Sequence, residues 1–183
     1  NLLENIDEET YFIFSSSCTV YGQADRMPIT EDNPIKKSES PYGETKQICE
    51  GILEKFCEAN PLFNNITLRY FNPIGAHKSG IIGELPLGKP ENLVPFITQT
   101  AIGKREQLVV FGDDYNTSDG TCIRDYIHIE DLADVHVLCL EYLIQKKNKA
   151  NYEFYNVGTG KGLSVLELIN LFEKVNNIKI NYK

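Results

Sequence analysis

Short apolar runs that alternate with amphipathic segments are the feature that most limits the possible folds of this chain. Residues 11–14 form a continuous apolar run that ends in three serines, and residues 66–71 are predicted to form a second strand. Between them, residues 41–59 carry apolar side chains at helical spacing. This alternation is typical of a layered α/β protein with a mainly parallel sheet, because buried parallel strands are apolar throughout.

The second half of the chain continues the alternation. Gly and Pro are concentrated in residues 75–90, which predicts a long loop of the kind that binds ligands. Residues 158–162 read G-T-G-K-G, which is not the spacing of a dinucleotide-binding turn and predicts only a tight turn. The expected helices are 93–102, 131–145 and 164–175, the last opened by a capping box of Ser164 and Glu167, and the expected strands are 108–111, 122–129, 153–157 and 178–182.

The segment from Ser40 predicts a helix with a defined start. Serine is a favoured cap, and Pro41 suits the first helical position. We expect the helix to end before Asn60-Pro61 and to bury one apolar stripe. The stripe consists of Ile48, Cys49, Ile52, Leu53 and Phe56.

Composition excludes several classes of partner. The 18 basic and 26 acidic residues give a net charge of -8, and such a surface repels phosphate backbones, so we expect no nucleic-acid partner. No apolar run approaches the roughly 20 residues that span a bilayer, so we expect no membrane partner. The five cysteines are scattered without C-x-x-C, which indicates a reduced, cytoplasmic protein. The three histidines lie far apart, and we expect no metal site.

Tyr42 and Lys46 stand four positions apart at the start of the predicted helix, after the strand that ends in serines. At this spacing an ammonium lies beside a phenol on one helix face. A nearby positive charge stabilises a phenolate, so the phenol becomes a usable general base. A second pair of the same spacing, Tyr142 and Lys146, shows that spacing alone is weak evidence. The alternative is an exposed pair without a chemical role.

Polar side chains end both predicted strands of the first half, at the edge where open α/β sheets bind ligands. Ser15, Ser16 and Ser17 end the first strand, and Tyr70-Phe71-Asn72, which includes one aromatic apolar residue, ends the second. An aromatic side chain there can pack on a cofactor ring, and an amide can hold a phosphate or a hydroxyl. Arg124 lies in an otherwise apolar strand, where an unpaired guanidinium is costly. Its partner is an anionic ligand or, alternatively, Asp125 or Asp131.

Five motifs give the chain a resemblance to the UDP-galactose (UDP-glucose) 4-epimerases, which are extended short-chain dehydrogenases/reductases. The first two occur throughout that superfamily, whereas the last three are specific to the epimerases. The motifs are S-S-S-C-T-V-Y-G (15–22), S-P-Y-G-E-T-K (40–46), L-R-Y-F-N-P-I-G-A-H (68–77), E-N-L-V-P (91–95) and D-G-T-C-I-R-D-Y-I-H-I-E-D-L-A (119–133).

The resemblance implies a role in galactose metabolism. UDP-galactose and UDP-glucose would interconvert with NAD through oxidation at C4, rotation of the 4-keto sugar and re-reduction on its other face. Tyr42 would be the base, Lys46 would hold the nicotinamide ribose, Ser17 would bond the 4-oxygen, and these three with Phe71 would contact NAD. The UDP-sugar would contact Ser17, Tyr42, Asn72, Asn92, Leu93, Val109, Val110, Phe111 and Arg124.

The resemblance also implies a domain organisation. Residues 1–72 would be the remainder of a Rossmann-like NAD-binding domain, and residues 73–183 mostly a smaller α/β UDP-sugar-binding region, with 131–157 returning to the Rossmann sheet. The helix 41–59 would form a homodimer interface. The family's glycine-rich turn and its C-terminal gatekeeper segment are missing from these residues, and the chain does not begin with methionine. We therefore expect a fragment with the C-terminal part of a doubly wound parallel sheet.

Two alternatives to an active epimerase stay open. A nucleotide-sugar 4,6-dehydratase requires a carboxylic acid beside the serine, but Cys18, Thr19 and Val20 follow Ser17 here. The other alternative is a catalytically incomplete fragment that only binds a nucleotide sugar.

Overall fold

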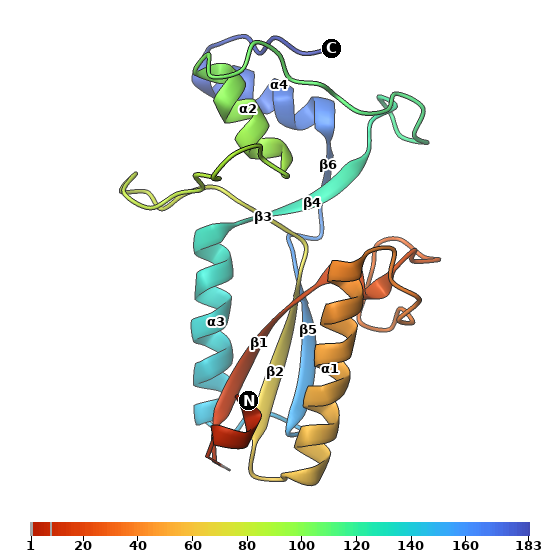
Figure 1. Ribbon diagram of the computed structural model, residues 1–183, viewed down its shortest axis with the longest axis vertical. Helices are drawn as coiled ribbons and strands as arrows, with labels where there is room; N and C mark the ends of the chain where they lie inside the picture. The colour runs from red at the N-terminus through yellow and green to blue at the C-terminus, as the bar shows by residue number, and fades with distance from the viewer. Residues whose placement is uncertain (1, 8) are drawn as a thin grey trace. The chain divides into compact units, whose positions relative to one another are not determined.

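The chain divides into two compact units, which the computed structural model describes over residues 2–7 and 9–183 (Figure 1). Unit 1 comprises Asn1–Phe71 and Asp131–Gly158. Unit 2 comprises Asn72–Glu130 and Thr159–Lys183. Each unit has a three-stranded sheet of its own.

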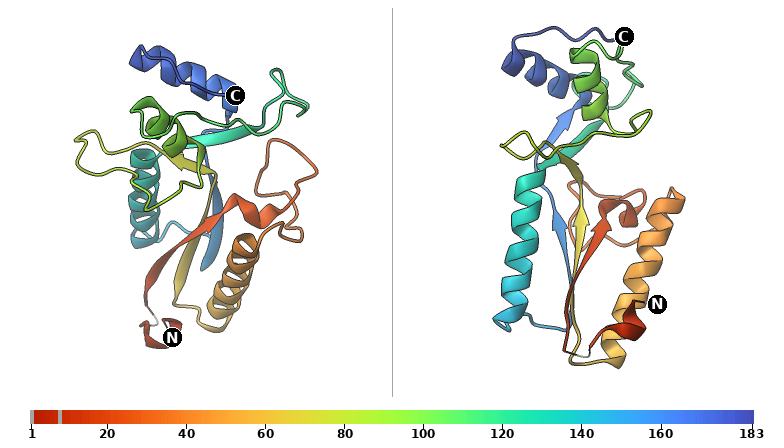
Figure 2. Two further views of the ribbon diagram at one scale, coloured as in Figure 1. Left: turned by 45° about the horizontal axis from the view of Figure 1, so that its top comes forward. Right: turned by 60° about the vertical axis from the view of Figure 1, so that its left-hand side comes forward.

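Unit 1 is a parallel sheet between two helices. The strand order is β1-β2-β5, and every described residue of β2 from 65 to 69 is buried. Helix α1 covers one face of the sheet and helix α3 covers the other (Figure 2). The α/β class with a parallel sheet is therefore confirmed. The elements are η1 (Leu3–Asn5), β1 (Tyr11–Ser17), η2 (Cys18–Tyr21), α1 (Pro41–Ala59), β2 (Asn64–Tyr70), α3 (Ile129–Ile144) and β5 (Tyr152–Val157).

Helix α1 begins and ends where the sequence predicts. Ser40 Oγ accepts a hydrogen bond from Gly43 N at 3.1 Å, with proline in the first turn. The predicted apolar stripe is wrong in part, because Ile48 and Ile52 are 55% and 52% exposed. The helix carries apolar residues on two faces, and the face toward the sheet includes Leu53 and the buried Glu50.

Gly43 allows the first turn of α1 to lie close to η2. A β-carbon at residue 43 would collide with Ser38 Oγ and lie 3.2 Å from Thr19 O. We expect Gly43→Ala to lower the free energy of unfolding by about 1–3 kcal/mol through overpacking. Gly51→Ala on the same helix is the matched control, because a β-carbon there meets nothing within 4 Å.

The control change is expected to stabilise the helix by about 0.5–1 kcal/mol, the helix propensity difference between alanine and glycine. Urea unfolding curves of the two variants measure both effects. Equal shifts of the two curves would contradict the close approach at Gly43.

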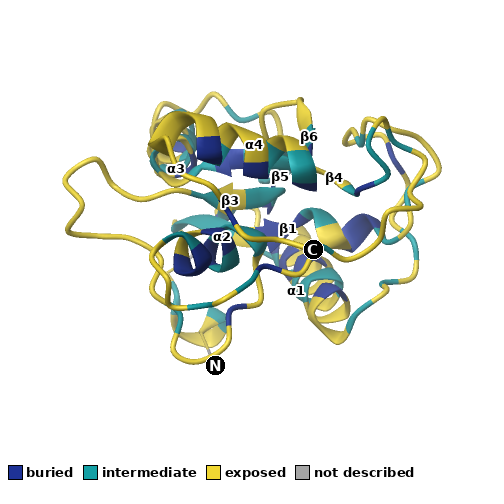
Figure 3. Cartoon of the chain, turned by 90° about the horizontal axis from the view of Figure 1, so that it is seen from above, coloured by how far each residue is buried: buried dark blue, intermediate teal, exposed yellow. Residues whose placement is uncertain are grey.

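Unit 2 packs two helices on one small core. The buried cluster contains Ile97, Leu108, Val165, Ile169 and Ile180. Helices α2 and α4 therefore show a buried and an exposed face (Figure 3). The predicted capping box of α4 is confirmed, because Ser164 and Glu167 bond each other's backbone N–H groups. The elements are β3 (Asn72–Ile74), α2 (Leu93–Ala101), β4 (Ile123–His128), β6 (Gly162–Ser164) and α4 (Val165–Asn176), with β3 parallel and β6 antiparallel to β4.

The prediction of strands at 108–111 and 178–182 is wrong, because neither segment forms a strand. They meet in one parallel bridge between Leu108 and Tyr182. Leu108 N donates to Asn181 O at 2.9 Å, and Val110 N donates to Lys183 O at 2.8 Å. Lys183 N also donates to Leu108 O at 3.1 Å, so the pairing reaches residue 183.

Asp119 ties the start of α4 to the preceding loop of unit 2. Its carboxylate accepts hydrogen bonds from Ser164 Oγ and from Thr121 N and Oγ1, the last two at 2.9 and 2.8 Å. The bond from Ser164, followed by those from Thr121, lowers the pKa of Asp119. A lowered folded-state pKa gives stability that is present above the unfolded value of about 3.9 and lost as pH falls through the folded value.

We therefore expect the stability of the protein to fall more steeply with acid than that of an Asp119→Asn variant. Urea unfolding of both proteins at pH 6 and at pH 3 measures this difference. Identical losses of stability between the two pH values would show that Asp119 does not contribute.

Candidate active site

Lys46 is fixed to the carboxyl end of β1. Its Nζ donates a hydrogen bond to Ser15 O at 2.8 Å and lies 5.5 Å from the centroid of the Tyr42 ring. The ammonium also lies 5.2 Å from the centroid of the Phe14 ring. An ammonium has three donors, so this anchor leaves two hydrogens for a ligand. The predicted pair thus lies together, one helical turn apart, at the ligand-binding end of the sheet.

Ser17 ends β1 and caps η2. Its side chain is buried, and Oγ accepts hydrogen bonds from Thr19 N at 3.2 Å and Thr19 Oγ1 at 3.0 Å. The hydroxyl of Ser17 keeps its own hydrogen for an acceptor. Because Gly43 lies against Thr19, the first turn of α1 and the end of β1 are neighbours. Tyr42 is 55% exposed there.

Tyr70 is a polar neighbour of this site whose contacts the sequence did not indicate. Its hydroxyl lies 2.7 Å from Ser15 Oγ and 2.6 Å from His136 Nε2. Burial raises the pKa of Tyr70, the bond with Ser15 lowers it, and the nearby charges of Cys139 and Tyr42 raise it. His136 Nδ1 donates to a carbonyl of its own helix at 2.8 Å, so Nε2 of the neutral ring is an acceptor.

The predicted nucleotide contacts belong to unit 2, whereas Phe71 ends unit 1. Phe71 N donates to Val157 O at 3.0 Å and so continues the β2–β5 ladder. Asn72 begins β3 opposite Tyr126 of β4. Phe71 and Asn72, although consecutive, therefore belong to different units.

The remaining predicted contacts of unit 2 differ in exposure. Asn92 precedes α2, is exposed, and makes no side-chain cap. Val109 and Phe111 are 42% and 79% exposed. Leu93 and Val110 instead pack against the core of unit 2. Asn92, Val109 and Phe111 are therefore accessible to a ligand. Leu93 and Val110 are held in the packing of the core.

Arg124 lies in β4 as predicted but is exposed, which corrects the expectation of a buried guanidinium. Its Nη1 donates to Ile123 O at 2.8 Å, and both residues are exposed at the start of β4. In the described part of the chain, neither Asp125 nor Asp131 forms an ion pair with it. Asp125 instead accepts three hydrogen bonds of 2.6–2.9 Å from residues 159–160 and holds the predicted tight turn. Arg124 is thus available to an anion.

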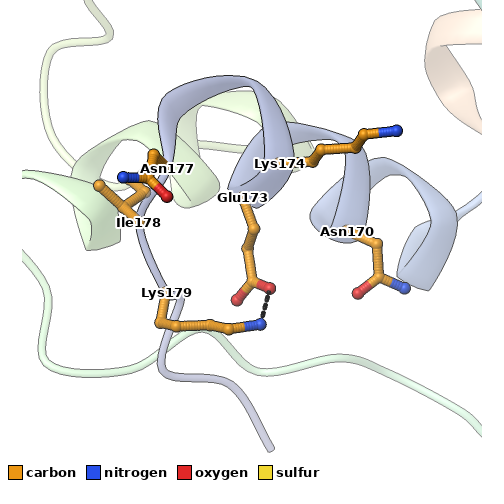
Figure 4. Close-up of a pocket in the computed structure, with 6 residues that line it drawn as sticks. All are labelled: Asn170, Glu173, Lys174, Asn177, Ile178 and Lys179. Atoms are coloured by element: carbon orange, nitrogen blue, oxygen red, sulfur yellow. Dashed lines mark hydrogen bonds and ion pairs between the residues drawn. The ribbon is translucent and has the colours of Figure 1, made fainter.

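Two hollows lie away from these residues. One, of about 410 Å³, lies beside the end of α4, where Glu173 is already bonded to Lys179 at 2.7 Å (Figure 4). The other, of about 310 Å³, lies in unit 1 beside Glu50 and Arg69. Within residues 2–7 and 9–183, no cluster of three histidine, cysteine or acidic side chains is arranged to hold a metal. In the same residues, no helix has both the length and the apolar character to cross a bilayer.

Comparison with known proteins decides the family. The sequence pattern of the NAD dependent epimerase/dehydratase family matches residues 1–158. The chain belongs to this family. A family member from Haemophilus influenzae, named UDP-glucose 4-epimerase, is 53% identical over 172 residues. These residues are 94% of this chain and 50% of that protein, so the chain spans about half the length of its relative.

Solved structures of family members have the same fold. The UDP-glucose 4-epimerase of Bifidobacterium longum, in complex with NAD+ and UDP, has a TM-score of 0.88 and 46% identity. The match covers 94% of this chain and 50% of that one. The enzyme of Stenotrophomonas maltophila, with NAD and formylated UDP-arabinopyranose, has a TM-score of 0.90 and 45% identity, covering 95% and 51%. The resemblance to the epimerases is therefore confirmed.

Proposed function

We propose that this chain carries the proton-transfer residues of an NAD-dependent UDP-glucose 4-epimerase, an isomerase of galactose metabolism. The observation that carries the proposal is the position of Lys46, which is anchored to Ser15 O beside the Tyr42 ring, on the strand that Ser17 ends. The names of the relatives support the same activity.

The side chains of unit 1 suit the cofactor named by the family. Lys46 has two unused donors for ribose hydroxyls, and Ser17, Tyr42 and Phe71 are the other residues that would hold NAD. When bound, NAD supplies a reversible acceptor and donor of hydride at its nicotinamide ring.

Residues of this chain would transfer the proton of the sugar 4-hydroxyl. Tyr42 would take the proton of the sugar 4-hydroxyl, and the Lys46 ammonium would stabilise the phenolate before that transfer. Ser17 would donate its free hydrogen to the 4-oxygen. After the 4-keto sugar rotates and C4 receives hydride on its other face, Tyr42 would return the proton to the 4-oxygen, so each cycle leaves the tyrosine unchanged.

Residues of unit 2 would bind the nucleotide. The exposed Arg124 suits the diphosphate, since guanidinium and phosphate form charge-assisted hydrogen bonds. Asn72, Asn92, Val109 and Phe111 would contact the rest of the UDP-sugar. Leu93 and Val110 would support that surface from the core.

The direct test is conversion of UDP-galactose without added NAD. The protein is purified with whatever natural sequence flanks residues 1–183, and the products are identified by NMR. Appearance of UDP-glucose supports the proposal. A folded protein that binds UDP-galactose without converting it would indicate a binding remnant, and a 4-keto-6-deoxy product would indicate a dehydratase.

We also propose a homodimer through α1 in a cytoplasmic protein, and the five cysteines, all within the described residues, form no disulfide, which agrees with a reducing compartment. Ile48 and Ile52 form an exposed apolar pair on that helix. A combined Ile48→Glu and Ile52→Glu variant is expected to be monomeric by light scattering. Leu62→Glu, an equally exposed site outside the helix, is the matched control and is expected to remain dimeric. A dimeric double variant would contradict this interface.

A further inference from the structure

A buried ion pair joins the helix that carries Tyr42 and Lys46 to the sheet beneath it. Glu50 of α1 and Arg69 of β2 are only 4% and 3% exposed. Arg69 Nη2 donates to Glu50 Oε2 at 2.6 Å, and Arg69 Nε donates to Glu50 Oε1 at 3.1 Å. The chemistry proposed above uses neither residue.

The pair is the centre of a larger network within unit 1. Ser16 Oγ donates to Glu50 Oε1 at 2.5 Å, which adds β1. Arg69 Nη1 donates to the Tyr21 hydroxyl at 2.9 Å, which adds η2. Tyr21 in turn donates to Asn156 Oδ1 at 2.7 Å, which adds β5. One network therefore joins α1 to all three strands of the sheet and to the turn after β1.

Aromatic rings hold the guanidinium in place. The Arg69 guanidinium carbon lies 4.1 Å from the centroid of the Phe154 ring and 4.9 Å from that of Tyr21. A planar guanidinium that is stacked and bonded along its edge has one orientation. Because the Glu50 carboxylate bonds to this guanidinium, the orientation of Arg69 also fixes the position of α1 on the sheet.

The network contacts the immediate neighbours of the proposed catalytic residues. Ser16 precedes Ser17, and Glu50 lies one helical turn beyond Lys46. Tyr21 belongs to the turn that Ser17 caps. The ends of α1 and β1 that would hold the sugar are thus set relative to each other by directional hydrogen bonds.

Stability alone does not explain a buried pair of this kind, because well-packed apolar residues of similar volume stabilise a core as well or better. We propose that Glu50 and Arg69 are positioning residues for the epimerase reaction, which fix Tyr42 and Lys46 of α1 against Ser17. The proposal rests on the proposed function. The role of the pair is to hold the reacting groups in place, because a displacement of about 1 Å can lower a rate about 100-fold.

The test removes both charges together, so that neither is left buried alone. A Glu50→Leu, Arg69→Met double variant is compared with a Lys36→Met, Asp25→Leu double variant, which removes a more exposed ion pair in the same unit, outside α1. We expect the first variant to unfold near the wild-type temperature, with kcat lower by about 10- to 100-fold and KM for UDP-galactose nearly unchanged. The control keeps wild-type kcat.

A second measurement separates positioning from a general loss of order. In a Tyr42→Phe background, the Glu50, Arg69 double change is expected to cause little further loss of the residual rate, because positioning acts through Tyr42. Multiplicative losses, or full kcat in a folded double variant, would overturn the proposal. If the double variant does not fold, Glu50→Asp serves instead, because it keeps the charge and shortens the contact. Wild-type kcat in Glu50→Asp would then overturn the role.

An inactive wild-type protein would overturn the proposed function and this role together. An active wild-type protein with a fully active double variant would overturn this role alone.

Discussion

Replacement of Tyr42 by phenylalanine is expected to lower the rate of UDP-galactose conversion by about 10²- to 10⁴-fold, the usual contribution of a general base. The change removes only the hydroxyl that would accept the sugar proton. The ring, its contact with the Lys46 ammonium and the anchor on Ser15 O are retained. Initial rates with saturating UDP-galactose measure the loss, and calorimetric titration with UDP is expected to show unchanged binding.

Tyr142→Phe is the matched control for this prediction. Tyr142 belongs to the second Tyr-x-x-x-Lys pair, near the end of α3, and we assign it no part in the reaction. Its variant is expected to turn over like the wild type. Unchanged turnover in Tyr42→Phe would remove that residue as the base.

Replacement of Arg69 alone by methionine is expected to lower the free energy of unfolding by about 3–5 kcal/mol, because the Glu50 carboxylate then remains buried without a partner. Arg105→Met is the matched control. Arg105 also stacks on an aromatic ring, Phe96, at 4.8 Å and donates to Gln99 at 2.7 Å, but it faces no buried carboxylate. Its loss is expected to cost about 1–2 kcal/mol, the sum of one cation–π contact and one hydrogen bond.

Urea unfolding of both variants gives the comparison. Adding Glu50→Leu to the Arg69→Met variant is expected to recover most of the lost stability, since the unpaired charge is removed. Equal costs for the two arginine changes would show that the buried carboxylate is not the source of the penalty.

Local signals in the sequence predicted the starts of two helices well. The start of α1 depends on Ser40 and Pro41, and that of α4 on Ser164 and Glu167, so each signal lies within one helical turn. The strands β3 and β6 have three residues each, too few for an apolar pattern, and their pairing with β4 is tertiary. The exposure of Ile48 on α1 follows from which face meets the sheet, and periodicity cannot choose between two apolar faces.

The candidate site, like the fold, was predictable only where the signal lies within a few neighbouring residues. The spacing of Tyr42 and Lys46 indicates their contact, but the anchor of the ammonium on Ser15 O joins residues 31 positions apart. Glu50 and Arg69 gave a signal that sequence reasoning missed, an acid within an apolar helix face and a base within an apolar strand. Their pairing depends on the packing of α1 on the sheet. The functional roles of the site residues stay predictions.

Because the lysine is anchored on a main-chain oxygen, the identity of the side chain at residue 15 does not decide where the ammonium lies. Substitution at that position can alter the neighbourhood of Tyr70 while the cation keeps its place. The backbone of β1 therefore sets the position of the cation, whereas the side chain at residue 15 can vary.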